Sequence, residues 1–105
     1  MGMEHRWSER KNIVMDVTLH YGPVGKIAGK TRDVSLEGMF VKTDGLVIPA
    51  RSEVMVTFAT KEEHGELNHC VPAYVVHNND AGVGLMLRHN GYKDFYALRD
   101  MLQAA

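Results

Sequence analysis

Apolar and polar residues alternate along much of the chain between residues 13 and 89. In the first run, every second residue is apolar, from Ile13 through Met15, Val17 and Leu19 to Tyr21. A second run, Glu53–Ala59, places Val54, Val56 and Phe58 on one face. A period of two residues is typical of a strand with one buried face. Both runs therefore predict half-buried β-strands.

Turn-forming residues separate these runs from four further strands. Tyr21–Gly25, Thr43–Gly45 and Asn78–Gly82 read as turns, the last as the strongest hairpin signal, and Lys61–Gly65 reads as a charged loop. Turns that recur about every 8–12 residues favour a small antiparallel barrel or sandwich. The remaining strands are expected at about Lys26–Ser35, at Met39–Lys42, at Leu67–His77 with a bend at Pro72, and at Val83–Leu87.

The period changes near residue 90. Asn90 can cap a helix whose apolar residues recur at helical spacing, at Phe95, Leu98, Met101 and Leu102. The predicted fold class is therefore all-β: a barrel of six to seven antiparallel strands with one C-terminal α-helix. We expect the helix to close an open end of the barrel or to cover one of its faces.

Length and composition indicate one domain, 1–105. It divides into a flexible arginine-bearing arm (1–12), the barrel (13–89) and the helix (90–104). The formal net charge of −1 gives no general attraction for a nucleic acid polymer, and no apolar run is long enough for membrane insertion. A single cysteine, Cys70, and the lack of a signal peptide fit a cytoplasmic protein. The pattern does not indicate an oligomeric state.

Candidate chemistry begins with the segment Arg32–Gly38. Asp33 and Ser35 alternate with apolar residues, so in an extended chain they point to one face, which we expect to be exposed. Gly38 follows, where backbone and ligand can approach closely. A carboxylate, a hydroxyl and bare backbone can hydrogen-bond a planar ligand. The alternative is a strand end with a turn, for which Asp, Ser and Gly are common.

The arm carries a second candidate feature. Arg6 and Arg10 are four residues apart, and Trp7, the single tryptophan, lies between them. Guanidinium groups on such an arm can bind phosphate and stack on a purine base. The alternative is a solvated tail.

An enzyme or a metal site has less support. His64, His69 and Cys70 are close in sequence, but in a strand His69 and Cys70 point to opposite faces. Cys70 is more simply a small buried apolar group. The chain has no nucleophile elbow, P-loop or dinucleotide-binding motif. We therefore assign no catalytic residue and no metal ligand, and keep a small metal-dependent hydrolase as the less favoured alternative.

Both motifs, in this order, resemble those of PilZ domains. The resemblance rests on Arg6-x-x-x-Arg10 and on Asp33-x-Ser35-x-x-Gly38, which runs into Met39-Phe40-Val41. Tyr74–His77 followed by Gly82–Leu85 is similar to the closing hairpin of that family. Two differences stand out. The position near His77 often carries arginine in the family, and His5 precedes the first arginine, where the residue is thought to influence ligand stoichiometry.

The resemblance implies a non-enzymatic receptor on a six-stranded barrel, with cyclic di-GMP as its ligand and no other cofactor. It implies that the arm becomes ordered on binding and that the new surface signals to a protein effector. The process that is regulated, whether motility, adhesion or polysaccharide synthesis, is left open, and a nucleotide-free adaptor is the alternative. The implied ligand contacts are Arg6, Arg10, Asp33, Ser35 and Gly38, with possible further contacts at His5, Trp7 and His77.

Overall fold

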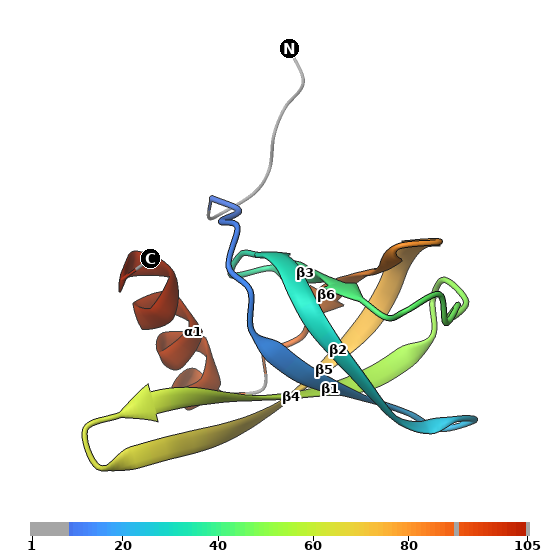
Figure 1. The fold of residues 1–105 in the computed structure, drawn as a ribbon. Helices are drawn as coiled ribbons and strands as arrows, with labels where there is room; N and C mark the ends of the chain where they lie inside the picture. Colours follow the sequence, from blue (N-terminus) through green and yellow to red (C-terminus); the bar gives the residue numbers. More distant parts are fainter. Residues whose placement is uncertain (1–8, 90, 105) are drawn as a thin grey trace.

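The computed structural model describes residues 9–89 and 91–104, with the backbone alone at position 62. Six antiparallel strands close into a barrel in the order β1-β2-β3-β6-β5-β4, and one helix follows (Figure 1). The predicted fold class is confirmed. The elements are β1 (Asp16–Tyr21), β2 (Gly25–Val34), β3 (Gly38–Lys42), β4 (Glu53–Glu62), β5 (Gly65–Asn79), β6 (Gly82–Leu87) and α1 (Tyr92–Ala104).

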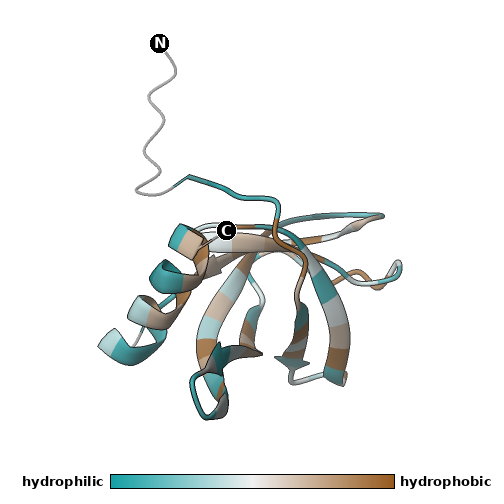
Figure 2. Cartoon of the chain, turned by 60° about the vertical axis from the view of Figure 1, so that its left-hand side comes forward, coloured by the Kyte–Doolittle hydropathy of each residue, from teal (hydrophilic) through white to brown (hydrophobic). Residues whose placement is uncertain are grey.

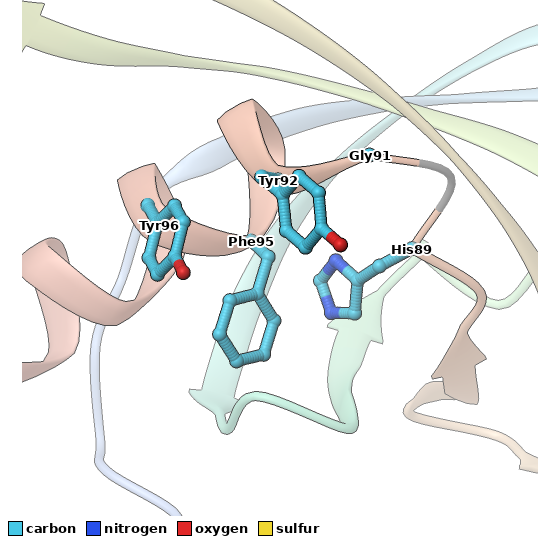
Figure 3. Close-up of a pocket in the computed structure, with 5 residues that line it drawn as sticks. All are labelled: His89, Gly91, Tyr92, Phe95 and Tyr96. Carbon is cyan, nitrogen blue, oxygen red and sulfur yellow. The ribbon is translucent and has the colours of Figure 1, made fainter.

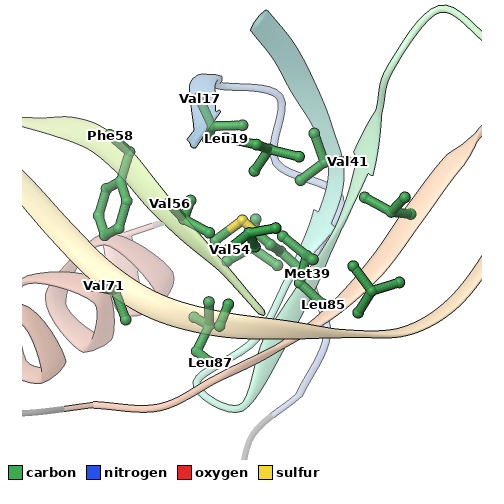
Figure 4. Packing of buried hydrophobic residues seen from close by; sticks show 14 of the residues in the cluster. Val17, Leu19, Met39, Val41, Val54, Val56, Phe58, Val71, Leu85 and Leu87 are labelled. Carbon is green, nitrogen blue, oxygen red and sulfur yellow. The ribbon is translucent and has the colours of Figure 1, made fainter. Parts of the chain in front are cut away.

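The alternation of apolar residues explains the core. Val17, Leu19, Val54 and Val56 are buried, as the period of two predicts, and they pack together inside the barrel (Figure 4). Figure 2 shows the same alternation as bands of hydrophobic and hydrophilic residues along the strands. Burial of one face of every strand is the main stabilising contribution to such a small barrel.

The first strand is shorter than predicted, because Thr31 on β2 binds the preceding segment. Its backbone N–H donates to the carbonyl of Met15 over 3.0 Å, and its hydroxyl donates to the carbonyl of Ile13. The Met15 N–H donates in turn to the Thr31 hydroxyl oxygen. The ladder between β1 and β2 therefore begins at Asp16, although Ile13 and Met15 still pack against the core.

The hairpin of β4 and β5 is longer than predicted and extends beyond the rest of the barrel (Figure 1). The expected charged loop is a turn of two residues, Glu63 and His64. Pro72 pairs regularly with Met55, and the register of β5 shifts further along the strand instead. The turn predicted at Asn78–Gly82 is confirmed.

Helix α1 lies alongside this hairpin (Figure 1). Leu98 and Leu102 are buried in the barrel's hydrophobic cluster, as predicted, so the helix completes the core. Lys11 Nζ donates to the carbonyl of Leu102 in the last turn, over 2.8 Å. The predicted cap, Asn90, lies outside the described residues.

In the described part of the chain, α1 is too short and too polar to cross a membrane, and no other helix there could do so.

Candidate functional site

Two irregularities in the barrel turn polar side chains to its outer face. In β2, Thr31 points inward and pairs with Val41, and regular alternation would turn Asp33 inward as well. The register shifts between Thr31 and Asp33, so Arg32 is an extra residue and Asp33 pairs with Phe40 instead. Bulges of this kind reorient side chains and are common near binding sites.

A second shift, between Val75 and His77 in β5, has the same effect. His77 then pairs with Gly84 of β6, which itself pairs with Phe40 of β3. Asp33, Phe40, Gly84 and His77 therefore form one row across four strands; we call these residues, with Arg32, the outer row.

Arg10 brings the arm to this row. Its Nε and Nη2 atoms both donate to Asp33 Oδ1, over 2.9 and 2.5 Å. Arg32 Nε donates to the other carboxylate oxygen, Oδ2, over 2.9 Å. The neighbouring Lys11 exchanges backbone hydrogen bonds with Val34, which fixes the arm beside the end of β2. The structure thus joins one residue of each predicted motif.

The electrostatics of the cluster favour an anion. Burial acts to raise the pKa of Asp33, but hydrogen bonds from Arg32 and Arg10, with the attraction of both charges, outweigh it and hold the pKa below the ordinary range. One ionised carboxylate therefore faces two guanidinium groups. The cluster has a local excess of positive charge in a chain whose formal net charge is −1.

Ser35 and Gly38 are placed differently from our expectation of an exposed face. Ser35 is fully buried, Asp33 is only 8% exposed, and Gly38 is also buried. The Ser35 hydroxyl oxygen accepts the N–H of Gly38 over 3.2 Å, closing the β2–β3 turn. A Cβ on Gly38 would lie 2.1 Å from the carbonyl oxygen of Leu85, so only a glycine here lets strand β6 pack this close to β3. For both residues, the turn alternative describes what the structure shows.

Three of the predicted contacts, His5, Arg6 and Trp7, lie outside the described residues. Arg10 and Lys11 are described, and both are hydrogen-bonded to the rest of the domain, although Arg10 is also exposed to solvent.

The residues of the hydrolase alternative do not converge. His64 is exposed at the β4–β5 turn, whereas His69 points inward and Cys70 points outward. The opposite orientation of the last two was predicted, but the expectation that Cys70 is buried is wrong. Among the side chains that the structure describes, no three from His, Cys, Asp or Glu could hold a metal ion together.

The contacts of His69 indicate a role in the stability of the fold. Its Nδ1 is hydrogen-bonded to Asp94 Oδ1 over 2.7 Å, and its Nε2 to Thr60 Oγ1 over 2.8 Å. Its ring stacks on Phe58, with centroids 5.1 Å apart. This network ties the first turn of α1 to the β4–β5 hairpin.

An aromatic hollow of about 470 Å³ lies at the start of α1 (Figure 3). Its lining includes Tyr92, Phe95 and Tyr96. His89, also in the lining, is hydrogen-bonded through Nε2 to the carbonyl of Leu36, so the hollow is next to the β2–β3 turn. None of the predicted site residues that the structure describes lines it, and the described lining contains no lysine or arginine to hold a phosphate.

Sequence reasoning missed Arg32 and Phe40 as members of the site. The sequence signal that could have found them is a break in the alternation of inward-facing and outward-facing residues. Continuing the alternation from Ile27 through Thr31 would turn the charged Asp33 into the core, and continuing it from Val75 would turn His77 inward. Each conflict predicts a bulge, and the first bulge adds Arg32 to the outer face.

Solved structures with the same fold are distant in sequence. One is the PilZ domain of CeSA from a cellulose-synthesizing bacterium, with 16% identity, a TM-score of 0.69, and 92% of this chain and 97% of that chain covered. Another is the Bacillus subtilis inhibitor of motility, MotI/DgrA, with 21% identity and a TM-score of 0.76. That match covers 96% of this chain and 53% of the other, so this chain spans about half of the motility inhibitor.

No curated protein sequence matches the chain. The sequence model of the PilZ domain does match, over residues 4–102, which is nearly the whole chain and includes both the arm and the outer row. The closed barrel, the order of its strands and this match agree, and the chain belongs to the PilZ domain family.

Proposed function

We propose that this protein is a receptor for cyclic di-GMP that has no catalytic activity of its own and signals to a protein effector. The observation that carries the proposal is the contact of Arg10 with Asp33, across 23 residues of sequence. It brings the guanidinium of one motif and the carboxylate of the other to a single point on the outer face. The family match supports the same conclusion.

The chemistry of the cluster suits the ligand. Cyclic di-GMP has two guanines and two negatively charged phosphates. The Watson–Crick edge of guanine offers adjacent N–H donors, which a carboxylate can accept as a pair. Arginine forks bind phosphate through two hydrogen bonds at once. Asp33 and Arg10 therefore offer complementary groups for both parts of the ligand.

Binding requires an exchange of partners at Asp33. In the free protein, Arg10 occupies Oδ1 with two N–H groups, and Arg32 occupies one position on Oδ2. A carboxylate accepts about four hydrogen bonds in all, so a guanine edge needs the position that Arg10 holds. We infer that guanine takes this position when Arg10 has left Asp33, and that Arg10 then binds a phosphate. The new position of the arm is the surface that an effector would recognise.

The test is isothermal titration of the full chain with cyclic di-GMP, GTP and cyclic GMP. We expect binding of cyclic di-GMP and far weaker binding of the two mononucleotides, because a single guanine cannot engage both motifs. The variant Asp33→Asn should bind cyclic di-GMP more weakly than wild type. Its matched control is Asp16→Asn, since Asp16 is an exposed aspartate paired with Lys30 away from the outer row. If titration with cyclic di-GMP releases or absorbs no heat of binding, the proposal is overturned and a nucleotide-free adaptor is favoured.

A further inference from the structure

Phe40 is an aromatic residue on the outer face of the barrel that is nonetheless covered. Its neighbours Met39 and Val41 belong to the hydrophobic core, so alternation turns Phe40 outward. It is still only 1% exposed. Side chains of the outer row cover it: the guanidinium carbon of Arg32 lies 4.0 Å from its ring centroid, and the ring of His77 stacks on it at 5.9 Å.

Two contacts fix the guanidinium group of Arg32 over the ring of Phe40. The ring of Phe40 supports one face of its guanidinium, and Nε is hydrogen-bonded to Asp33 Oδ2. The side chain still has 53% of its surface exposed. An arginine that is ordered before a ligand arrives loses less conformational entropy on binding. The result is a planar cationic surface next to the carboxylate that we assign to guanine.

We propose that Arg32, supported by Phe40, is a further ligand-binding residue that stacks on a purine base of the bound nucleotide. The inference rests on the proposed function and adds a contact outside the two motifs. A guanidinium plane stacks on aromatic rings as well as pairing with carboxylates, and Arg32 is placed to do both. Phe40 is a positioning residue, since the guanidinium covers its ring and keeps the base from touching it.

The experiment separates planarity from charge. Arg32→Lys keeps the cation and its attraction to Asp33, but it removes the plane. We expect this variant to bind cyclic di-GMP roughly tenfold more weakly than wild type, the size of a desolvated stacking contact. Arg32→Ala should lose at least as much. Arg88→Lys is the matched control, because this exposed arginine follows β6 four positions beyond Gly84, and it should bind like wild type.

A spectroscopic readout tests the stack itself. The Nε–H resonance of Arg32 in wild type should move upfield on addition of cyclic di-GMP, because a base above the guanidinium plane shields it. Circular dichroism and thermal melting check that each variant is folded. Phe40→Leu, which keeps an apolar cover but no ring, should weaken binding less than Arg32→Lys does.

The outcomes are distinct. If wild type binds and Arg32→Lys binds equally well, Arg32 acts by charge alone and the stacking inference is wrong, while the proposed function stands. If wild type does not bind cyclic di-GMP, the proposed function fails, and the stack fails with it. An unchanged Arg32 Nε–H resonance in the saturated complex would also overturn the stack.

Discussion

Two polar clusters, each built around an aspartate, show how differently the same chemistry is used in this barrel. Asp94 joins His69 and Thr60 in a network whose histidine side chain is entirely buried, and it ties α1 to the hairpin. Asp33 joins Arg10 and Arg32 on the outer face, where both cations are partly exposed. The buried network has its partners within the fold. The outer cluster has two cations for one carboxylate, and both cations are open to solvent.

The comparison predicts that substitutions in the buried network lower the stability of the fold, whereas substitutions in the outer cluster lower the affinity for the ligand. The largest effect is expected for His69→Ala, which removes a buried ring and leaves Asp94 and Thr60 without their partner. The free energy of unfolding should fall by about 3 kcal/mol, from the lost packing and hydrogen bonds together. Urea denaturation measures this, with His64→Ala at the exposed turn as the control histidine.

The same variant, if folded at low temperature, should bind cyclic di-GMP with nearly wild-type affinity. Asp94→Asn gives a milder test, because an amide oxygen can still accept the histidine N–H. The distinction between the clusters collapses if His69→Ala is as stable as wild type, or if Asp94→Asn abolishes binding while it remains folded.

The next largest effect concerns Asp33→Asn, which puts an N–H donor where the guanine edge also donates. Affinity should fall by about 1.5–3 kcal/mol, as for a lost hydrogen bond to a charged group. The variant also relieves repulsion of the phosphates, so part of the loss should be recovered at low salt. Titrations at low and high salt measure both effects. Wild-type affinity at high salt would show that Asp33 has a structural role alone.

Arg10→Ala should weaken binding by about 1.5 kcal/mol, near the lower end of that range. The variant loses a phosphate contact, but it also frees Asp33 from its competitor. Its residual binding should depend less on ionic strength than that of wild type. The melting temperature should change little, because a partly exposed ion pair contributes less than about 1 kcal/mol. A large drop in melting temperature would place Arg10 with the structural cluster instead.

The pKa of Asp33 gives a smaller effect that depends on pH. Because its pKa is lower in the folded protein than in the unfolded chain, the carboxylate stabilises the fold above the ordinary aspartate value. That contribution is lost as pH falls through the depressed folded value, below about pH 4. The stability difference between wild type and Asp33→Asn should therefore shrink on acidification, as thermal melts at a series of pH values would show. A constant difference would contradict the depressed pKa.

The smallest effect is expected for Lys11→Met, which keeps the aliphatic stem but removes the donor to Leu102. The last turn of α1 has no basic residue of its own, so Lys11 supplies the cation that its carbonyl groups favour. Amide hydrogen exchange in residues 101–104 should accelerate by an amount that corresponds to about 0.5 kcal/mol. Faster exchange throughout the barrel would mean that Lys11 has a wider role.

Much of the fold could be predicted because burial repeats with a fixed period. Val54, Val56 and Phe58 have the same phase in the sequence and in the core, and Leu98 and Leu102 show the helical period. The start of β1 could not be predicted, because it depends on Thr31, which is distant in sequence and binds Ile13 and Met15.

The sequence pointed to the residue types of the candidate site but not to their geometry. Asp33 and Arg10 were identified from motifs, and the structure adds that each is the other's partner. That pairing depends on a bulge, and a single extra residue in a strand leaves a weak trace in hydrophobic periodicity. Ser35 was expected on an exposed face and is buried, because the same Asp, Ser and Gly residues that suggest a ligand site also build a tight turn.

The Arg10–Asp33 contact also has a kinetic consequence. A guanine can reach Oδ1 only during the fraction of time that Arg10 is released, so association includes a step that the ligand does not accelerate. A partly exposed ion pair opens and closes quickly, so this opening acts as a rapid pre-equilibrium and lowers the association rate constant in proportion to the open fraction. In stopped-flow mixing, the observed rate should therefore rise linearly with cyclic di-GMP concentration, with a slope reduced by that fraction. If the chain is the receptor proposed above, its response to a pulse of messenger would be slowed by the same factor at every concentration.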